Sequence, residues 1–363
     1  MKAAIISLGS VSSKWTRDAM KKYFDSVKNL NLKHIEVNLG SGQDPILYKG
    51  EPLEKFDCVY AKGSFKYAML LRAITSFFSD KAYMPIKDNA FLTVHDKIVT
   101  HQELQRHGIP MPKTYLSSGI DAAKEILKKI NFPVIMKFPQ GTQGKGVMYA
   151  ESYPSASSLL DALETLKQPV LIQEYIESGE RDIRALVVGD RVVAAMERKA
   201  VKGEKRANIH MGGKGKAINL DVKSRKIAIK TAAAVGAEIC GVDLLRSAKG
   251  PVVIEANLSP GLQGITEATG IDVADRIAHY LYQKTKEFVE KEQKMNGDRI
   301  LPDAGIFNSD KEQQIITGLD FRGDRILLPE LVTKMTGLKD DDQVEISAKK
   351  GFLKIKKFDV KEV

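Results

Sequence analysis

The sequence predicts a mixed α/β (α+β) protein built from several units. Segments with strand-like and helix-like apolar spacing alternate over residues 1–92, which is typical of a parallel sheet with helices on both faces. Glycine-rich turns and hairpin signals then dominate as far as residue 290. A polar stretch without apolar periodicity at 291–309 indicates a linker before a short β-rich segment. The length of 363 residues also exceeds that of one ordinary domain.

We therefore expect an N-terminal domain at 1–92, a domain over 93–290 and a small domain at 310–363. The middle domain should have two α+β lobes, at about 93–168 and 169–290. In the N-terminal domain, apolar runs predict strands at 2–8, 34–39 and 56–61 and helices at 15–24 and 65–78. Gly9 follows the first strand, but the spacing G-x-G-x-x-G is absent, so we reject dinucleotide binding there.

The first lobe offers two lysines and a glycine-rich turn. One helix is expected at 93–107 with Lys97 in its first turn, and a strand at 132–138 reaches Lys137. The segment 139–146 holds three glycines in six residues before a further strand at 147–150. Exposed N–H groups beside a lysine suit nucleotide phosphates, although an ordinary hairpin tip has the same pattern. A P-loop is excluded, because its spacing is absent and a strand follows the glycines.

The second lobe is expected to be a sheet of hairpins with a basic segment. Strands are predicted at 169–176, 184–188 and 191–196, and helices at 224–239 and 272–291. Residues 191–230 contain 12 Lys and Arg residues against three acidic residues, a surplus of nine within a net charge of +10. This charge should attract phosphates or carboxylates. Nucleic acid fits less well, because the segment has no aromatic residue for base stacking.

Residues 241–261 are predicted to form a hairpin that places two acids opposite each other. With a three-residue connection at 248–250, Asp243 pairs with Glu255, and Asn257 shares their face. Opposed carboxylates repel, so positive charge is expected between them. Two carboxylates and an amide oxygen suit Mg²⁺ held together with nucleotide phosphates. A surface hairpin with solvated acids is the alternative.

The composition argues against a membrane protein, a disulfide-rich protein and a zinc protein. Apolar residues come in short runs, and none approaches the ~20 residues that a membrane helix requires. Cys58 and Cys240 are too few for a disulfide framework or a zinc site. The N-terminus enters a strand at once, so we expect no signal peptide and a cytoplasmic protein without membrane contact.

The chain also carries a series of short, spaced motifs. They are Asp96-Lys97, Met136-Lys137, Gly141-Thr-Gln-Gly-Lys-Gly146, Gln173-Glu-Tyr-Ile176, Asp182-Ile-Arg184, Val192-Val-Ala-Ala-Met-Glu-Arg-Lys199, Arg206-Ala-Asn-Ile-His210, Gly241-Val-Asp243, Glu255-Ala-Asn257 and Ser259-Pro-Gly261. In this order they resemble the ATP-grasp carboxylate–amine ligases, and within them the RimK-like branch that adds glutamate or similar amino acids to a carboxyl acceptor. The resemblance covers roughly residues 1–290 and is weakest before residue 90.

The resemblance implies an ATP-grasp fold, an ATP site and two Mg²⁺ ions, with Mn²⁺ able to substitute. The residues implied to bind the nucleotide are Lys97, Lys137, Gly141, Thr142, Gln143, Gly144, Gln173, Glu174, Tyr175, Ile176, Asp182 and Arg206. Lys97 and Lys137 would hold phosphates, the backbone of Glu174 and Tyr175 would read the adenine edge, and Asp182 would bind ribose. The loop at 141–146 would close over the phosphates.

The remaining implied roles concern the metal and the reaction. Asp243, Glu255 and Asn257 would hold the magnesium ions, which agrees with the role inferred above from strand register. The implied catalytic residues are Arg198, Arg206 and Asn208. Arg198 would clamp an acyl phosphate, although a structural ion pair with Glu197 or a neighbour is the alternative. His210 could accept a proton from the amine, but a positioning role is favoured.

The implied reaction is an ATP-dependent amide synthesis. ATP converts a carboxylate into an acyl phosphate, an amine attacks it, and the products are an amide, ADP and phosphate. Glutamate is the expected amino acid, and the basic segment favours an acidic acceptor, which could be a small molecule, a peptide or a carrier protein. The rival hypothesis is a DNA-binding regulator that merely senses nucleotide.

The C-terminal segment departs from the RimK-like pattern. It resembles the AbrB-type swapped-hairpin domain through Leu328-Pro-Glu330, Thr336-Gly-Leu338 and Val344-Glu-Ile346. That family commonly dimerises and often binds DNA. Residues 310–363 hold 11 basic and 11 acidic residues, so the electrostatic footprint for DNA is missing. We therefore expect a module for homo-oligomerisation or acceptor docking.

Overall fold

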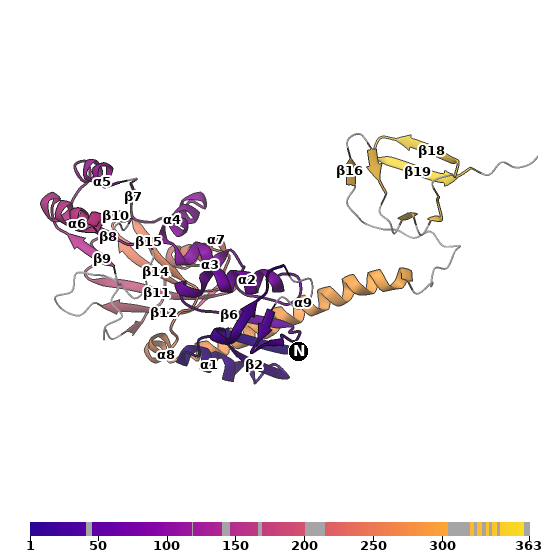
Figure 1. Cartoon of the computed structure of the whole chain (residues 1–363), viewed down its shortest axis with the longest axis horizontal. Helices are drawn as coiled ribbons and strands as arrows, with labels where there is room; N and C mark the ends of the chain where they lie inside the picture. Colours follow the sequence, from indigo (N-terminus) through magenta and orange to yellow (C-terminus); the bar gives the residue numbers. More distant parts are fainter. Residues whose placement is uncertain are drawn as a thin grey trace, which may run out of the picture. The chain divides into compact units, whose positions relative to one another are not determined.

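The computed structural model describes most of the chain and divides it into two compact units, Met1–Val289 and Glu290–Val363 (Figure 1). The described residues are 1–40, 46–117, 119–139, 146–165, 169–199, 215–303, 320–322, 325–328, 332–333, 336–339 and 342–358.

The first unit begins with a three-stranded parallel sheet in the order β2-β1-β6. Its strands are β1 (Lys2–Ser7), β2 (Ser26–Asn31) and β6 (Cys58–Ala61). Helix α1 (Val11–Met20) connects β1 to β2, and β6 joins the opposite edge of β1. The carboxyl ends of β1 and β6 therefore lie side by side at a point where the strand order reverses. Four consecutive residues of β1, Ala3 to Ile6, are fully buried.

The predicted strands of this domain are found, with two differences. The segment expected as a strand at 34–39 begins in the short 3-10 helix η1 (Leu32–His34) and continues as β3 (Ile35–Val37), which pairs with β4 (Ile46–Tyr48) and β5 (Glu51–Pro52). Strand β2 was not predicted. Its sequence is SVKNLN and only Leu30 is buried, so it lacks the apolar run expected of a sheet strand.

The helix expected at 93–107 is two helices, α3 (Ala90–His95) and α4 (Lys97–Arg106). Asp96 separates them with an extended backbone, and its carboxylate accepts hydrogen bonds from the N–H groups of Ile98 and Val99. The Lys97 N–H donates to the Pro139 carbonyl at 3.0 Å. This cap therefore fixes Lys97 as the first residue of α4, beside the start of the glycine-rich segment.

The first lobe contains a four-stranded antiparallel sheet in the order β7-β10-β8-β9, so the strand expected at 169–176 belongs to this lobe and not to the second lobe. The strands are β7 (Thr114–Leu116), β8 (Val134–Lys137), β9 (Val147–Ala150) and β10 (Leu171–Glu174), accompanied by helices α5 (Ile120–Leu127) and α6 (Tyr153–Thr165). This lobe has a hydrophobic core of its own, in which Leu127, Met136 and Leu160 are among the buried residues.

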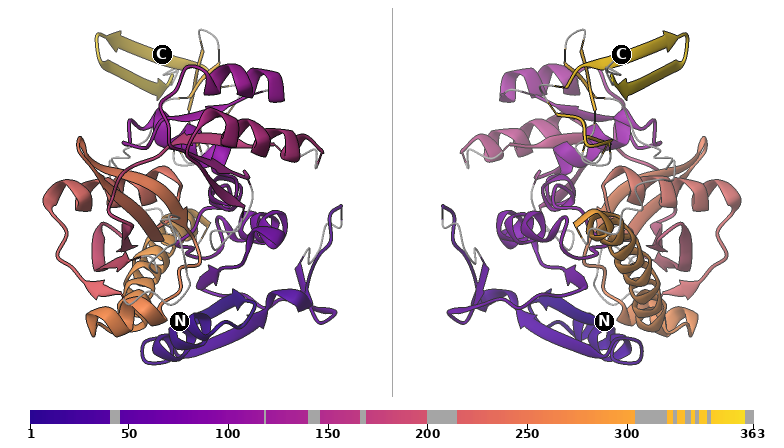
Figure 2. Two further views of the ribbon diagram at one scale, coloured as in Figure 1. Left: turned by 90° about the vertical axis from the view of Figure 1, so that its left-hand side faces the viewer. Right: turned by 90° about the vertical axis from the view of Figure 1, so that its right-hand side faces the viewer.

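The second lobe contains a five-stranded antiparallel sheet in the order β13-β12-β11-β14-β15. Its strands are β11 (Arg181–Val188), β12 (Arg191–Lys199), β13 (Lys216–Ala217), β14 (Ile239–Ser247) and β15 (Gly250–Asn257). Helices α7 (Val222–Ala234), α8 (Gln263–Thr269) and α9 (Val273–Asp303) complete it. Its core is continuous with that of the N-terminal sheet. Figure 2 accordingly shows the start of α9 beside the N-terminal strands, where Phe24 packs edge-on against Tyr282.

The central hairpin confirms the expected pairing of Asp243 with Glu255, but by a different route. The turn has two residues rather than three, because Ser247 pairs with Gly250. A bulge then leaves Ile254 unpaired in β15, since Leu244 pairs with Val253 and Asp243 with Glu255. The predicted turn was one residue too long, and the extra residue in the bulge restores the predicted pairing of Asp243 with Glu255. Asn257 pairs with Gly241 and lies on the same face as Glu255, as expected.

The second unit contains two hairpins among its described residues. They are formed by β16 (Asp320–Arg322) with β17 (Arg325–Leu327) and by β18 (Val344–Lys349) with β19 (Phe352–Lys357). None of the side chains whose burial is described in this unit is buried. Helix α9 extends to Asp303, so much of the segment expected as a linker at 291–309 is helical. Among the described residues, no helix is both long enough and apolar enough to cross a membrane.

The cap at Asp96 yields a first prediction. Asp96→Ala removes the side-chain acceptor for the Ile98 and Val99 N–H groups and should lower the free energy of unfolding by about 1 kcal/mol. Asp96→Asn keeps an acceptor oxygen and should lose much less. Urea denaturation followed by circular dichroism measures both variants, and equal stability losses would contradict the capping role.

Candidate active site

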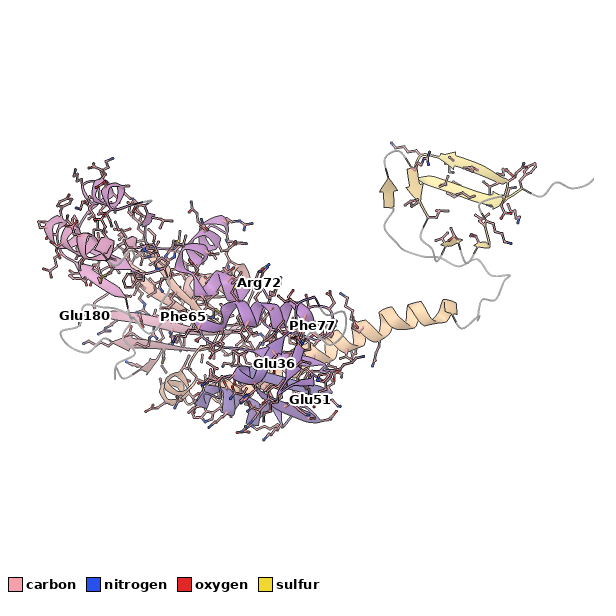
Figure 3. The ribbon with its side chains drawn as sticks, in the orientation of Figure 1. Glu36, Glu51, Phe65, Arg72, Phe77 and Glu180 are labelled. Atoms are coloured by element: carbon pink, nitrogen blue, oxygen red, sulfur yellow. The ribbon has the colours of Figure 1, made fainter. Side chains whose placement is uncertain are left out.

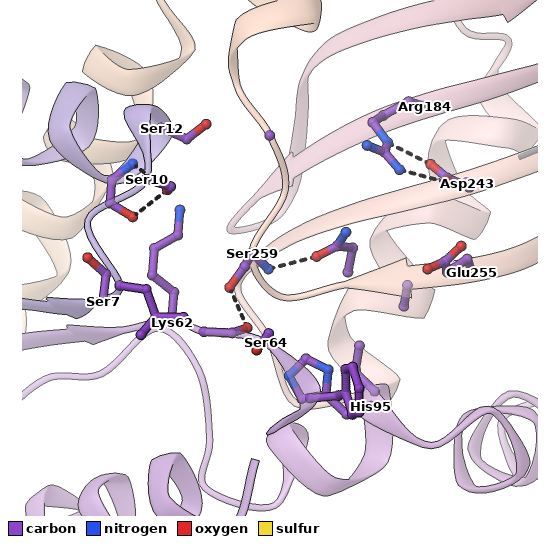
Figure 4. A pocket seen from close by; sticks show the side chains of 18 of the residues that line it. Ser7, Ser10, Ser12, Lys62, Ser64, His95, Arg184, Asp243, Glu255 and Ser259 are labelled. Atoms are coloured by element: carbon purple, nitrogen blue, oxygen red, sulfur yellow. Dashed lines mark hydrogen bonds and ion pairs between the residues drawn. The ribbon is translucent and has the colours of Figure 1, made fainter. Parts of the chain in front are cut away.

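A cavity of about 470 Å³ lies between the N-terminal sheet, helices α3 and α4, and the five-stranded sheet (Figure 4). The residues that carry charge or a titratable ring at its wall are Lys62, His95, Lys97, His101, Arg184, Arg198, Asp243 and Glu255. Asn257 and several serines also line it. Phe65, labelled in Figure 3, reaches the cavity from the 3-10 helix η2 (Phe65–Tyr67), which precedes helix α2 (Ala68–Phe78).

One face of the five-stranded sheet gathers the charged residues of this wall. Strand register places Arg184 opposite Asp243, Asp182 opposite Arg198, and Asp243 opposite Glu255. Because side chains alternate along a strand, these five residues share a single face across four neighbouring strands. The sequence motifs in which they occur lie far apart in the chain, and the sheet brings them together.

Asp243 is the centre of a buried ion-pair network. Arg184 donates to it through Nε at 2.8 Å and Nη2 at 2.7 Å, and Arg198 Nη2 donates at 2.9 Å. Arg198 also donates to both carboxylate oxygens of Asp182, at 2.6 and 2.7 Å. The exposed fractions of Asp182, Arg184 and Asp243 are 2%, 4% and 2%. Burial opposes ionisation of Asp243, but the two arginines outweigh it and hold its pKa well below the usual range.

The positive charge expected between Asp243 and Glu255 comes, in part, from protein side chains. Positive charge does lie beside Asp243, but Arg184 and Arg198 supply it, so the strand register alone does not require a metal. For Arg198, an ion pair with a neighbour is present, and the neighbours are Asp182 and Asp243. Glu197 instead lies near Arg181 and Arg246 at the surface.

The donor set still fits a hard dication. Glu255, Asn257 and Asp243 bring oxygen atoms to the same cavity wall, and such oxygens are the ligands that Mg²⁺ prefers. Burial raises the pKa of Glu255 and the charge of Asp243 adds to this effect, while Lys97 opposes it. No cluster of three His, Cys, Asp or Glu side chains occurs in the described part of the chain, so a metal here would need the amide of Asn257 or ligand oxygens as well.

Lys137 is held by a buried chain of polar side chains. Its Nζ donates to Gln173 Oε1 at 2.6 Å, and Gln173 Nε2 lies 2.8 Å from Thr114 Oγ1 and 3.0 Å from His101 Nε2. His101 Nδ1 lies 2.5 Å from the Lys97 carbonyl oxygen. All these contacts are satisfied if Gln173 donates to Thr114 and to His101 Nε2, and a neutral His101 donates from Nδ1. The network therefore ties together the two lysines expected to bind phosphates.

A smaller cavity of about 40 Å³ adjoins this network. It is lined by Pro112, Ile135, Lys137, Val147, Gln173, Glu174, Tyr175, Ile176, Leu245 and Ile254. It thus unites the residues expected at the adenine with Lys137 of β8, which is expected to hold phosphates. Ile254, the bulged residue of β15, lines both cavities. Most of this lining is apolar, from Pro112, Ile135, Val147, Ile176, Leu245 and Ile254.

The structure brings most, but not all, of the expected site residues together. Asp182, expected to bind ribose, lines neither cavity, and both of its oxygens bind Arg198. Six expected residues lie outside the described residues. They are Gly141, Thr142, Gln143, Gly144, Arg206 and Asn208.

Sequence reasoning also missed several residues of the larger cavity. Arg184 was part of a motif but received no role, and Lys62, His95 and His101 were not considered. For Lys62 a signal was present, since it directly follows a predicted parallel strand at the edge where such sheets bind ligands. For His101 no signal was available, because its partner Gln173 is 72 residues away.

The neutral state of His101 predicts a pH dependence of stability. Burial lowers the pKa of His101 to about 4, from an ordinary value near 6.5. Between about pH 6.5 and pH 4, His101 is therefore mostly protonated in the unfolded chain and mostly neutral in the folded chain. Stability contributed by neutral His101 is present above pH 6.5 and declines as pH falls, by up to about 1.4 kcal/mol per pH unit.

His101→Gln tests this dependence, because glutamine cannot take up the proton. Unfolding free energies of both proteins should be measured by urea titration at pH 7.5 and pH 5. The loss on acidification should be smaller in the variant than in the wild type. An equal loss in the two proteins would show that His101 does not titrate as described. Other groups cancel in the difference, including His95, whose pKa burial also lowers to about 4.

Comparison with known proteins places this geometry in a family. Residues 94–281 match the RimK-like ATP-grasp domain. A probable alpha-L-glutamate ligase of Vibrio cholerae is 38% identical over 286 residues, which cover 77% of this chain and 95% of that protein. A probable alpha-L-glutamate ligase of Thioalkalivibrio sulfidiphilus is 36% identical over 291 residues, covering 79% and 97%.

Solved structures agree on the fold. The ATP-grasp ligase PsnB, complexed with minimal precursor, Mg and ADP, superposes with a TM-score of 0.62 at 16% identity, covering 78% of this chain and 98% of that one. The RimK domain protein of Sphaerobacter thermophilus gives a TM-score of 0.60 at 19% identity, covering 77% and 99%. The chain therefore belongs to the RimK-like ATP-grasp family, and it is an ATP-dependent enzyme of the ligase class.

Proposed function

We propose that this protein joins the amino group of an amino acid, glutamate in the first instance, to a carboxylate of an acidic acceptor at the expense of ATP. The observation that carries the proposal is the continuous cavity wall on which Lys97, Arg198 and Glu255 meet. Cationic groups for phosphates and oxygen ligands for a magnesium ion are thereby available at one place. The names of the relatives from Vibrio cholerae and Thioalkalivibrio sulfidiphilus support glutamate as the amino acid.

The reaction would proceed in two steps, phosphorylation of the acceptor carboxylate and attack by the amine. A carboxylate oxygen of the acceptor attacks the γ-phosphorus of ATP, the bond to the β-phosphate oxygen breaks, and an acyl phosphate and ADP form. The neutral amine of the second substrate then attacks the acyl carbon, the bond to the phosphate oxygen breaks, and the amine proton passes to solvent or a nearby base. The products are an amide, ADP and phosphate.

The charged side chains would act mainly by neutralising this accumulated negative charge. Lys137, held by Gln173, and Lys97, at the start of α4, would contact the nucleotide phosphates. Arg198 is fixed by Asp182 and Asp243, so its guanidinium would meet the acyl phosphate in a preset orientation. Two Mg²⁺ ions, replaceable by Mn²⁺, would be held by Asp243, Glu255 and Asn257 and would stabilise charge on the transferred phosphoryl group.

Further roles come from the family pattern. The loop 141–146 would close over the phosphates and exclude water from the acyl phosphate. Arg206 and Asn208 would lie near the γ-phosphate and the acceptor. The adenine would occupy the cavity beside Tyr175, where the lining is largely apolar. Because Asp182 is committed to Arg198, we now assign it the positioning of that arginine in place of ribose binding.

The acceptor would be acidic and would meet the enzyme in the cytoplasm. The basic segment at 191–230 supports this charge preference. A small molecule, a peptide and a carrier protein all satisfy it. A solved structure of PsnB is complexed with the precursor peptide PsnA2, which supports a peptide as one class to test.

The experiment is ATP turnover with product analysis. The protein, ATP, Mg²⁺, a panel of amino acids led by glutamate and a cell extract as acceptor source should yield ADP and an acceptor heavier by one or more glutamyl residues in mass spectra. A protein that only senses nucleotide would give no amino-acid-dependent ADP. Glu255→Gln should lower the rate by about 100-fold or more, because it removes a charged ligand at the reacting phosphoryl group.

The matched control is Glu267→Gln, which changes the same chemical group at an exposed position of α8 outside the cavity lining. It should retain the wild-type rate. If Glu255→Gln turned over as fast as this control, Glu255 would have no part in holding the metal.

For the C-terminal unit we propose an AbrB-like module that assembles with a second copy of the chain. Support comes from apolar side chains exposed on its strands, among them Ile326, Ile346, Phe352 and Leu353. A unit of this size that exposes such residues gains a core only by pairing.

Removal of residues 310–363 should therefore reduce the oligomeric mass measured by light scattering. In the full chain, Ile346→Glu should have the same effect, because it places a charge on the proposed interface. Lys350→Glu, in the turn between β18 and β19, is the control and should leave the mass unchanged. An unaltered mass after the truncation would contradict the proposed assembly.

A further inference from the structure

The larger cavity has a second end that the proposed chemistry does not use. Figure 4 shows Ser7, Ser10 and Lys62 on one side and Arg184, Asp243 and Glu255 on the other. The first side is formed by the segment after β1, the start of α1 and the residues after β6. The acidic residues that line the cavity are Asp243 and Glu255, and neither belongs to this end.

Lys62 is the most unusual residue of this end. Only 3% of it is exposed, and within the described part of the chain no acidic side chain pairs with it. Its Nζ lies 5.4 Å from the ring centroid of Tyr60, which is a weak compensation for a buried ammonium group. Burial lowers the pKa of Lys62 to about 8, so the group remains mostly protonated at neutral pH. A buried charge without a partner is costly, and a cavity-lining position suggests that a ligand provides the partner.

The position of Lys62 in the fold is the second observation. It follows β6 directly, and its N–H donates to the carbonyl of Ile6 in β1 at 2.9 Å. It therefore stands at the carboxyl edge of the parallel sheet, between β1 and β6. The chain leaves β1 toward β2 on one side and returns as β6 on the other. Open α/β sheets bind ligands at such points, because the connecting segments diverge there and leave a crevice.

Helix α1 contributes donors to the same place. Its N-cap Ser10 accepts from the Ser13 N–H, and the Lys14 N–H binds the Ser10 carbonyl. The N–H groups of Val11 and Ser12 make no hydrogen bond within the described residues, and both residues line the cavity. Free N–H groups at the start of a ten-residue helix favour an anion.

We propose that Lys62 and the first turn of α1 bind a carboxylate of a dicarboxylic substrate, namely the carboxylate that does not react. This inference rests on the proposed ligase function. In an acceptor with two carboxylates, one would be activated at the end that carries Lys97 and Glu255 while the second is held at the Lys62 end, so the subsite would decide which of them is converted to the amide. In the incoming amino acid, which reacts through its amine, the subsite would hold the side-chain carboxylate.

A carboxylate fits better than a phosphate for two reasons. The end supplies one cationic side chain and no arginine among its described residues, which balances a single negative charge. Serine hydroxyls and helix N–H groups provide the remaining hydrogen bonds, as a carboxylate requires. The carboxylate could belong to the acceptor or to the side chain of the incoming amino acid, and the two sources are separable by experiment.

The test measures ligand affinity by calorimetry on the full chain in the presence of ADP and Mg²⁺. N-acetyl-L-glutamate has two carboxylates and no free amine, so it reports on the acceptor position. L-Glutamate reports on the incoming amino acid, and N-acetyl-L-glutamine has one carboxylate fewer. Lys62→Met should weaken binding of one dicarboxylate about 10- to 100-fold and leave ADP binding unchanged. Where the subsite holds a side-chain carboxylate, N-acetyl-L-glutamine or L-glutamine, which lack it, should bind both proteins equally weakly.

Lys33→Met is the matched control, because it removes the same charge from an exposed position of η1 outside the cavity. Its affinities should equal those of the wild type. Lys62→Met should also melt at the same temperature as the wild type or higher, since it removes a buried charge without a partner. If it fails to fold, Lys62→Gln takes its place.

Each outcome is decisive. Loss of N-acetyl-L-glutamate affinity assigns the subsite to the acceptor, and loss of L-glutamate affinity alone assigns it to the incoming amino acid. Equal affinities of wild type and Lys62→Met for both dicarboxylates would overturn the proposal, as would failure of the wild type to bind either one at millimolar concentration. Absence of turnover with intact, Lys62-dependent binding would instead contradict the proposed function.

Discussion

The buried pair between Arg184 and Asp243 is the interaction on which the site depends. It joins β11 to β14 at the centre of the five-stranded sheet, and Asp243 also receives Arg198 from β12. Removal of Asp243 would leave the buried Arg184 without the acidic partner that it has among the described residues, at a cost of about 3–5 kcal/mol. The network therefore fixes the face of the sheet, and through Arg198 it holds Asp182 as well. Such rigidity would suit the proposed role of this face in receiving phosphoryl groups, because its charges would need no reorganisation during the reaction.

The distribution of charge along the larger cavity is unequal. The acids stand at the end formed by β14 and β15, together with arginines from β11 and β12. Lys62, at the opposite end, has no acidic partner in the described part of the chain. A substrate with separated negative groups would find a cationic group at each end. The cavity is thereby suited to an elongated substrate with a negative group at each end, and the difference between its two ends would fix the orientation of that substrate.

The two larger hydrophobic cores of the first unit hold the walls of this site in place. The N-terminal sheet and the five-stranded sheet share one core, so the walls that carry Lys62 and Asp243 are held in register by packing. The lobe that carries Lys137 has a separate core. Its contacts with the rest of the site include the polar chain from Lys137 through Gln173 to His101. They also include the packing of Ile176, just after β10, against a small cluster of Leu245, Val252 and Ile254.

The sequence by itself determined the fold class, because apolar periodicity and motif spacing are local properties of the chain. It also indicated that Asp243 and Glu255 lie opposite each other, but through a three-residue turn that the structure does not have. It did not determine the two-residue turn or the bulge at Ile254, since neither changes the hydrophobic pattern. The tertiary structure alone decided that arginines neutralise Asp243, and that Lys62 is buried without an acidic partner among the described residues. Such facts depend on which strands become neighbours, and that choice is made by packing between segments far apart in sequence.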